Sequence, residues 1–535
     1  MLYLYYSNRQ ERLAAELASL PAPADPLVPE LVLVQNQGMA QWLTQELAQR
    51  RGISANVEYL LPAEFGWRLY RQLRPELPTT DSAFAREVLL WRVMALLPDC
   101  LDDPVFAPLA RYLAGELPAQ RRHQLAQRIT DVYDQYLVYR PDWLLAWEAG
   151  ESLGLGPEEA WQAALWRRLV QTDEPHRARL WQEFMELGDP APVLEALPER
   201  LCVFGVSSLP PAYLGLLRRV AEQREVHFFW LNPCREYWAD IVTAKTRDRF
   251  ENYWRKQGRP APVEALEEGN PLLASLGKLG RDAFALHWSE LLDGVASDDE
   301  AHFIEPAASH CLGLLQRDIL TLTARTADER PQLAADDGSL TVHACHSPMR
   351  EVQALYDELL ARFAADPTLA PRDVLVMTPD IETYAPYIHA VFGAPEDEAR
   401  RIPYTIADRT LKAESDVVRG FLALLECERG RFTAPVMFDL LQSPPVRARF
   451  GISADELPLI EHWLRETGIR WGLDRADRAR HGLPPTPDGT WEAGFRRLLL
   501  GYALPLGERS LFAGELPYDD IEGSDAETAG KLADA

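Results

Sequence analysis

The segment Leu31-Val-Leu-Val-Gln-Asn-Gln-Gly38 carries the pattern that decides the fold class. Four consecutive apolar residues bounded by polar ones predict a short strand that is buried on both faces, as in a parallel sheet. The turn that ends at Gly38 leads into helical spacing up to about Arg50. A strand pattern at Leu2–Tyr6 and a helical pattern at Asn8–Leu20 precede this segment, so the chain opens with a β-α-β-α unit.

A long helical stretch, residues 62–195, then interrupts the strand signal. Prolines separate its expected helices, which are Pro62–Leu73, Ser82–Leu97, Ala119–Val138, Pro157–Gln171 and His176–Leu187. Strand patterns return at Leu201–Val206 and Val226–Leu231, with a helix expected between them at Pro211–Gln223. The helical stretch therefore reads as an insertion, and Leu31–Val34 should share one parallel sheet with Leu201–Val206.

A second α/β unit is expected after a polar linker at Asp328–Gly338. Its elements should be a strand at Leu340–Ala344, a helix at Pro348–Ala365, a strand at Asp373–Met377 and a helix at Ile381–Phe392. From Asp416 the pattern is helical only, so this second sheet would be incomplete. The acidic end, Glu508–Ala535, lacks a hydrophobic stripe, and we expect it to be poorly ordered or loosely packed, with apolar surface left exposed on the second unit.

These patterns predict an α/β protein with two parallel-sheet domains. The chain of 535 residues is long enough for about three or four domains. Residues 1–61 and 196–330 would form the first domain, residues 62–195 its all-helical insertion, and residues 338–535 a truncated second domain with a helical part.

Sequence motifs for catalysis or metal binding are missing. A phosphate-binding loop, GxxxxGK[ST], should follow the first strand of a nucleotide-driven motor, but Ser7-Asn8-Arg9-Gln10 stands there. The Gly-Lys pairs Gly277-Lys278 and Gly530-Lys531 are both followed by leucine. His343-Ala-Cys345-His346 offers three metal ligands without a fourth, so we interpret them as ordinary strand-end residues. We expect no ATPase site, no nuclease centre and no metal in this chain.

The charge composition is unusual in two respects. The net charge is −26, which argues against a broad surface that coats nucleic acid. Of the 55 basic residues only five are lysines, and arginine presents a planar fork that suits phosphates and base edges. A GC-rich genome, which favours arginine codons, is the plainer explanation of this bias. A local arginine-lined channel remains compatible with an acidic protein.

The cysteines and the apolar runs point to a reducing compartment. The six cysteines are far apart and form no CxxC pair, so neither a disulfide framework nor a zinc ribbon is expected. The first residues lack the basic flank of a secretion signal, and no apolar run approaches the length of a membrane span. We therefore expect a cytoplasmic protein without membrane contact.

Two polar patterns could read nucleic acid. Gln37, Gln41, Gln45 and Gln49 recur every four residues and would form one helical stripe whose amides can pair with base edges. Between Arg128 and Arg140, Asp131, Asp134 and Gln135 flank an apolar stripe, and carboxylates can accept hydrogen bonds from base amino groups. A solvated helix face and an amphipathic helix with ion pairs are the plainer alternatives.

At these residues the sequence resembles RecC, the gamma chain of bacterial exodeoxyribonuclease V (the RecBCD complex). The resemblance covers nearly the whole chain, to about Asp519, and the family's chains are about twice as long. The matching segments include Leu33-Val-Gln-Asn-Gln-Gly-Met-Ala-Gln-Trp-Leu43, Asp134-Gln-Tyr-Leu-Val-Tyr-Arg-Pro-Asp-Trp143, Gly205-Val-Ser-Ser-Leu-Pro-Pro-Ala-Tyr-Leu214, Asn232-Pro-Cys-Arg-Glu-Tyr-Trp238, His346-Ser-Pro-Met-Arg-Glu-Val352 and Gly468-Ile-Arg-Trp-Gly472.

The resemblance implies a P-loop-helicase-like fold that has lost its ATP site, and it implies a set of DNA-binding residues. The positions that match the family's Chi-reading channel are Gln35, Gln37, Gln41, Leu61, Trp67, Asp131, Val132, Asp134, Gln135, Arg140 and Arg177. Gln37 stands where the family has threonine and Val132 where it has leucine. These two differences from the family would affect which hotspot sequence the channel reads. Gln41, Trp67, Asp134 and Arg140 should converge on one channel wall.

The resemblance also implies a function and partners. The chain would be a non-catalytic scaffolding and DNA-binding subunit that splits the duplex and scans the 3′-ended strand for the Chi hotspot. RecB-like and RecD-like subunits would complete a heterotrimer and carry the ATP and Mg²⁺ sites. Two alternatives stay open from the residues alone: an assembly scaffold without DNA contact of its own, and an active nuclease or ATPase.

Overall fold

The computed structural model divides the chain into two compact units, Met1–Thr341 and Val342–Ala535. It describes residues 1–23, 25–78, 82–114, 118–171, 174–256, 267–291, 302–395, 397–407, 409–410, 415–504, 511–518 and 520–535. Each unit has hydrophobic cores of its own and is described by itself.

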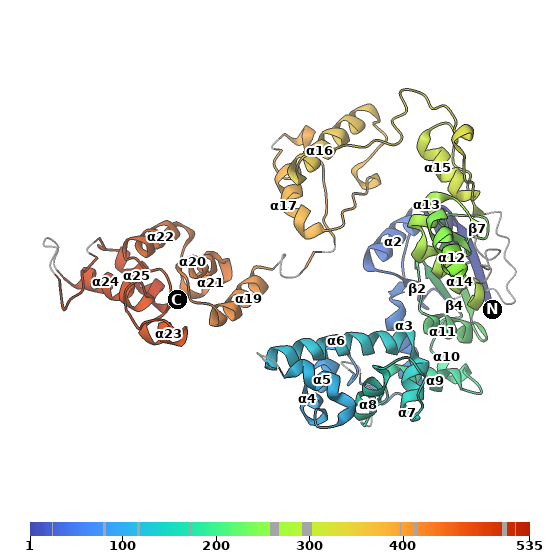
Figure 1. The fold of residues 1–535 in the computed structure, drawn as a ribbon. Helices are drawn as coiled ribbons and strands as arrows, with labels where there is room; N and C mark the ends of the chain where they lie inside the picture. Colours follow the sequence, from blue (N-terminus) through green and yellow to red (C-terminus); the bar gives the residue numbers. More distant parts are fainter. Residues whose placement is uncertain are drawn as a thin grey trace. The chain divides into compact units, whose positions relative to one another are not determined.

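Five parallel strands form the sheet of the first unit (Figure 1). They are β1 (Leu2–Ser7), β2 (Glu30–Val34), β3 (Val57–Leu60), β4 (Arg200–Phe204) and β5 (Glu225–Leu231), in the order β1-β5-β4-β2-β3. Strands β2 and β4 are neighbours, with Val32 opposite Cys202. The expected α/β class is therefore confirmed, and so is the expectation that the strand at Leu31–Val34 shares a sheet with the one that begins near Leu201.

Helices cover both faces of this sheet, because alternate strand residues point to opposite sides. One face carries α1 (Gln10–Ser19) and α2 (Gln37–Arg51), and the other carries α3 (Pro62–Leu73), α11 (Pro211–Ala221) and α14 (Lys278–Leu291). Val32 and Cys202 are buried under the first pair of helices, whereas Leu33 and Val203 are buried under the second group. Burial on both faces is what the apolar run at Leu31–Val34 predicts.

The helices between β3 and β4 divide between two cores. A separate body consists of α4 (Arg86–Cys100), α5 (Ala107–Leu113), α6 (Pro118–Tyr139), α7 (Pro141–Glu148) and α8 (Glu159–Leu169). Its core fully buries Tyr133, Trp147 and Trp166. The remaining helices α3, α9 (Arg177–Met185) and α10 (Ala191–Leu194) pack against the sheet. Helix α9 joins the two cores, since Ala178 lies in one and Phe184 in the other.

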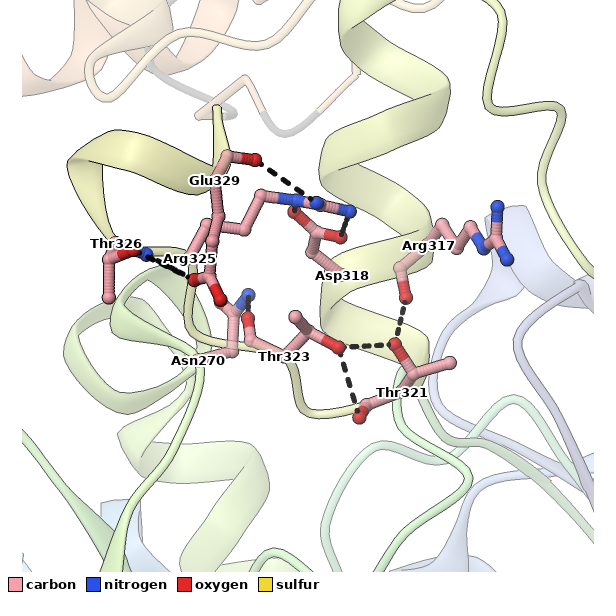
Figure 2. A network of polar contacts seen from close by, with 8 residues as sticks. All are labelled: Asn270, Arg317, Asp318, Thr321, Thr323, Arg325, Thr326 and Glu329. Carbon is pink, nitrogen blue, oxygen red and sulfur yellow. Dashed lines mark hydrogen bonds and ion pairs between the residues drawn. The ribbon is translucent and has the colours of Figure 1, made fainter. Parts of the chain in front are cut away.

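After β5 the first unit continues to α15. It ends in the segment that follows this helix, residues 321–341, which we call the strap. The elements of this region are β6 (Ile241–Val242), α12 (Ala244–Lys256), β7 (Glu267–Glu268), α13 (Pro271–Leu276), α15 (Cys311–Leu320) and a 3₁₀ turn at Ala327–Glu329. Figure 2 shows how the strap is held at the end of α15, where Arg325 donates two hydrogen bonds, of 2.6 and 2.7 Å, to the Asp318 carboxylate. In the same network, Asn270 donates to the carbonyl of Thr323 at 3.0 Å.

The strap is bonded again at the beginning of α15. The Asp337 carboxylate accepts from the backbone N–H of Cys311 at 2.6 Å, and the Ser339 hydroxyl accepts from that of Leu312 at 3.1 Å. The expected linker, Asp328–Gly338, is thus fastened to the first unit rather than free between units.

The second unit begins with two paired helices, α16 (Pro348–Ala365) and α17 (Ile381–Phe392). Both match the expected helices, but the strands expected at Leu340–Ala344 and Asp373–Met377 are not formed, and that part of the prediction is wrong. A strand needs a neighbour for its backbone groups, and the described residues of this unit supply none. The apolar side chains of Val342 and Met377 are consequently 91% and 85% exposed, which confirms the expected exposed apolar surface.

The remainder of the second unit is helical, as expected. It consists of α19 (Asp416–Arg429), α20 (Ala434–Gln442), α21 (Pro444–Phe450), α22 (Leu457–Glu466), α23 (Arg475–Arg480), α24 (Trp491–Ala503) and α25 (Asp525–Asp534), with 3₁₀ turns at Pro371–Asp373, Glu398–Arg400 and Ala454–Glu456. Their core surrounds the fully buried Trp463.

The expectation that the acidic end is poorly ordered is wrong where the structure describes it. Residues 508–510 and 519 lie outside the described residues, but Ile521, Ala529 and Leu532 are buried in the core of the second unit. On α25 itself, Thr528, Ala529 and Leu532 are buried, so three small or apolar side chains are enough to dock a ten-residue helix, a signal that the acidic composition conceals.

Candidate nucleic-acid interface

Several of the predicted DNA-binding residues lie at the carboxyl edge of the parallel sheet, where open α/β sheets bind ligands. Gln35 directly follows β2, and Leu61 directly follows the neighbouring β3. The Gln35 side chain accepts hydrogen bonds from the backbone N–H and the hydroxyl of Ser207, at 3.4 and 3.2 Å, in the loop after β4. The backbone N–H of Leu61 donates to the Glu64 carboxylate at 2.8 Å, which starts α3.

The glutamine stripe is exposed along α2. The helix begins at the Asn36 side chain, which accepts from the N–H of Met39 at 2.9 Å, and Leu43 and Leu47 on its inner face are fully buried. Gln37, Gln41 and Gln45 all point outward, and their amides form no hydrogen bond with any residue that the structure describes. Exposed, unpaired amides are able to bind an external partner, although a solvated helix face has the same exposure.

Trp67 extends this edge on α3. Its ring is half-buried and meets the ring of Tyr70 edge-on, with 5.9 Å between centroids. The guanidinium of Arg71 lies 6.0 Å from the centre of the indole. The indole is therefore held by the protein while part of its surface faces solvent.

The second group of predicted residues lies along α6, where two carboxylates are paired with arginines. Asp131 accepts from Arg86 on α4 at 2.6 and 2.8 Å, and this pairing raises the pKa of the Arg86 guanidinium. Asp134 forms an ion pair with Arg177 on α9, whose guanidinium also donates to the Asp134 carbonyl at 3.1 Å. A carboxylate has about four acceptor positions, so each aspartate can still accept a hydrogen bond from a base.

Val132 and Gln135 complete the outer face of α6, and both are exposed. They lie opposite Tyr133 and Leu137, which are buried in the helical body. The amphipathic pattern of this segment is thus confirmed, with the predicted residues on or beside its exposed face.

Two tyrosines connect the residues of α3 with those of α6. Tyr70 contacts Trp67. The pKa values of Tyr70 and Tyr213 are both raised by burial, and the positive charge of Arg177 partly opposes this rise, so Arg177 lies close to both rings. A Cβ atom built on Gly66 would lie 3.2 Å from the ring of Tyr213, so α3 approaches this tyrosine closely. Trp67 and the Asp134–Arg177 pair therefore flank one packed contact region.

Arg140 lines a separate cleft of about 470 Å³ between the α6–α7 junction, α9 and α11. Its guanidinium donates to the neighbouring carbonyl of Tyr139 at 3.0 Å and lies 5.4 Å from the ring of Trp143. The lining includes Trp181 and Arg218, but no other member of the predicted set is among the described residues around it. The convergence of Gln41, Trp67, Asp134 and Arg140 on one wall stays a prediction.

Sequence reasoning missed Arg86, Ser207 and Tyr213. Arg86 reaches Asp131 across 45 positions, and no periodicity links them. Ser207 follows the strand β4, so its place at the sheet edge could have been inferred from the strand order, had that order been known.

Comparisons with known proteins identify the family of this chain. The family "RecC, N-terminal domain" matches residues 2–322, which is more than half of the chain. The chain belongs to the RecC family. A second RecC family, "RecBCD enzyme subunit RecC fourth domain", matches residues 414–535, which include all helices from α19 to α25.

Curated relatives extend the match over the whole chain. It is 39% identical to the "RecBCD enzyme subunit RecC" of Escherichia coli K12, with 100% of this chain and 50% of that protein covered. The RecC proteins of Haemophilus influenzae and Mycolicibacterium smegmatis are 35% and 33% identical, again over 100% of this chain and over 51% and 48% of their own lengths. The chain thus spans about half the length of these RecC relatives.

Two further observations concern metals and membranes. Within the described ranges, no three His, Cys, Asp or Glu side chains gather as a metal site. None of the helices that the structure describes is both long and apolar enough to cross a bilayer.

Proposed function

We propose that this chain is a non-catalytic DNA-binding and scaffolding subunit of an ATP-dependent helicase–nuclease that repairs double-strand breaks by homologous recombination. In this role it helps to split the duplex and scans the 3′-ended single strand for the Chi hotspot. Membership of the RecC family and the name of its relatives, RecBCD enzyme subunit RecC, support RecB-like and RecD-like partners, which would carry the ATP and Mg²⁺ sites.

The observation that carries the proposal is the row of free glutamine amides on α2. Gln37 and Gln41 begin at the carboxyl edge of the sheet and have no protein partner among the described residues. Unpaired bases present open edges and faces, so amides, carboxylates and an indole suit a single strand better than a duplex. Each good contact of this kind contributes about 1–3 kcal/mol.

The turn between β1 and α1 supports a role without nucleotide hydrolysis. A phosphate-binding loop would occupy this turn, but it consists of Asn8 and Arg9 only. Asn8 is already engaged by Ile304, whose carbonyl accepts from the Asn8 amide at 2.8 Å and whose N–H donates back at 2.9 Å. A nucleotide would have to displace this segment.

The first test uses the full 535-residue chain and a random pool of 3′-tailed duplexes, from which bound tails are selected and sequenced. We expect enrichment of a sequence with the unsubstituted chain. Asp134→Ala should flatten that enrichment more than it lowers total affinity, because a carboxylate gains nothing from phosphates. Arg140→Ala should weaken binding to all tails, by roughly 5- to 150-fold.

The matched control is Gln49→Ala, set against the double variant Gln37→Ala/Gln41→Ala. Gln49 is exposed on the same helix but lies three turns from the sheet edge, so its loss should leave the enrichment unchanged. Binding without enrichment would contradict sequence reading, and absence of any binding would leave the scaffold alternative. ATP hydrolysis that depends on DNA would overturn the non-catalytic role.

A further inference from the structure

A cluster of aromatic and basic side chains lies near the beginning of α6, before Asp131 and the other predicted DNA-binding residues of that helix. Trp91 on α4 is 60% exposed, and its ring lies 5.8 Å from that of His123 on α6. Arg121 donates to the carbonyl of Tyr112 on α5 at 3.3 Å, so α4 and α5 both contact the first turns of α6. We call Trp91, Tyr112, Arg121, Arg122 and Arg128 the α6 basic patch.

The charges of this patch are not neutralised. Arg121, Arg122 and Arg128 have no carboxylate within ion-pair distance among the residues that the structure describes. No acidic residue occurs between Ala119 and Thr130, whereas the whole chain carries a net charge of −26. Three arginines within eight positions of one helix therefore leave a local positive charge that an external anion can neutralise.

The patch is continuous with the predicted reading face of α6. Arg121, Gln124 and Arg128 recur at spacings of three and four, and the same spacing leads on to Asp131 and Gln135. All of these positions are partly or fully exposed. One face of a single helix therefore carries two arginines of the patch, Arg121 and Arg128, together with two of the predicted reading residues.

We infer that the α6 basic patch is an additional contact for single-stranded DNA, in which arginines bind the backbone and Trp91 stacks on a base. The inference rests on the proposed function. Alternating guanidinium groups and exposed rings are the chemistry that holds a single strand without reading its sequence. A duplex offers no free base face to Trp91, so the patch should prefer the unpaired tail.

The test measures the affinity of the full 535-residue chain for a labelled single-stranded oligonucleotide at several salt concentrations. Trp91→Ala should weaken binding by about 5- to 150-fold and leave the salt dependence unchanged, because a stacked base releases no counterion. Arg121→Gln/Arg128→Gln should lower the slope of log affinity against log salt by about 1.4, or about 0.7 for each phosphate contact. Trp91→Phe should restore most of the lost affinity.

Controls match the exposure and the change of charge. Tyr502 on α24 is 59% exposed, so Tyr502→Ala removes a comparable aromatic ring from the second unit. Arg330→Gln/Arg401→Gln removes two exposed arginines elsewhere, with the same change in net charge. Both controls should bind like the unsubstituted chain.

The results separate this inference from the proposed function. If Arg140→Ala weakens binding while Trp91→Ala and the Arg121/Arg128 variant bind normally, the patch is not a DNA contact and the proposed function stands. If the unsubstituted chain binds no single strand at all, both fall. If the patch variants and the controls lost affinity equally, the loss would not come from contacts at the patch, and the inference would be overturned.

Discussion

His287 on α14 is buried in the sheet core with no hydrogen-bond partner for either ring nitrogen among the described residues. Its ring meets Trp230 edge-on at 4.3 Å between centroids and Phe228 at 5.3 Å. Burial disfavours the charged imidazolium and lowers the pKa of His287 to about 4. The side chain therefore supports the fold only while it is neutral.

This burial predicts a loss of stability in mild acid. An unfolded histidine titrates near 6.5, so its contribution is complete above pH 6.5 and is lost as the pH falls toward 4, by up to about 3 kcal/mol. His287→Phe should flatten the dependence of the free energy of unfolding on pH over this window, as measured by urea unfolding at pH 7.5 and 5. His462→Phe, at an exposed position, is the control. An unchanged slope in His287→Phe would contradict the prediction.

At the same scale, sequence alone predicted which residues share a face but not which residues pair. A spacing of four places Gln37 and Gln41 on one side of α2, and the structure agrees. The pairing of Asp131 with Arg86 depends on how α4 packs on α6. That packing depends on how side chains from different helices of the helical body fit together. A local sequence pattern does not contain this information.

Among the elements, the helix α25 shows how few contacts can dock a polar segment. Glu456 accepts from the Thr528 hydroxyl at 2.6 Å and from the Lys531 ammonium at 3.0 Å, both on α25. These bonds, with the N–H of Ser453, hold the pKa of Glu456 at about 2. The carboxylate is therefore ionised under all ordinary conditions and fastens α25 to the turn before α22.

Removal of this carboxylate should release α25. Glu456→Gln should lower the local stability of the helix by about 1–3 kcal/mol, seen as faster hydrogen exchange of its amides at pH 7. Lys531→Met keeps the Thr528 bond and should have a smaller effect. In the unsubstituted chain this protection is present above pH 4.5 and is lost as the pH falls toward 2. Unaltered exchange in Glu456→Gln would show that Leu532 and its apolar neighbours suffice.

The strands illustrate where local patterns succeed and fail. Leu31–Val34 and Asp373–Met377 have similar apolar runs, yet only the first forms a strand. The difference lies in the neighbours, since β2 is flanked by β3 and β4. A strand forms only when a neighbouring strand pairs with its backbone. The sequence of a segment therefore predicts that it can form a strand, but not which strand it pairs with.

For the molecule as a whole, the unpaired segments of the second unit should determine solubility. Val342, Leu375 and Met377 are 91%, 82% and 85% exposed, and exposed apolar segments with free backbone groups promote association. Val342→Lys/Met377→Lys should raise the concentration at which the chain remains monomeric in light scattering. Leu27→Lys, at an 85% exposed position in the first unit, should not.

Hydrogen exchange gives an independent check of the same prediction. Amides at 341–345 and 374–378 should exchange rapidly in the isolated chain and slowly once a polypeptide that supplies further strands is bound. Slow exchange in the monomeric chain would contradict the prediction, because it would mean that these segments already have partners.

The length of α6 fixes the distance between the basic patch and the residues that are proposed to read bases. Arg121 and Gln135 lie on one face of this helix, about 21 Å apart along its axis. At about 3.4 Å for each stacked nucleotide, that distance corresponds to roughly six nucleotides. With both proposals in place, a strand bound at Arg121 would present its bases to Asp131 and Gln135 in a fixed register.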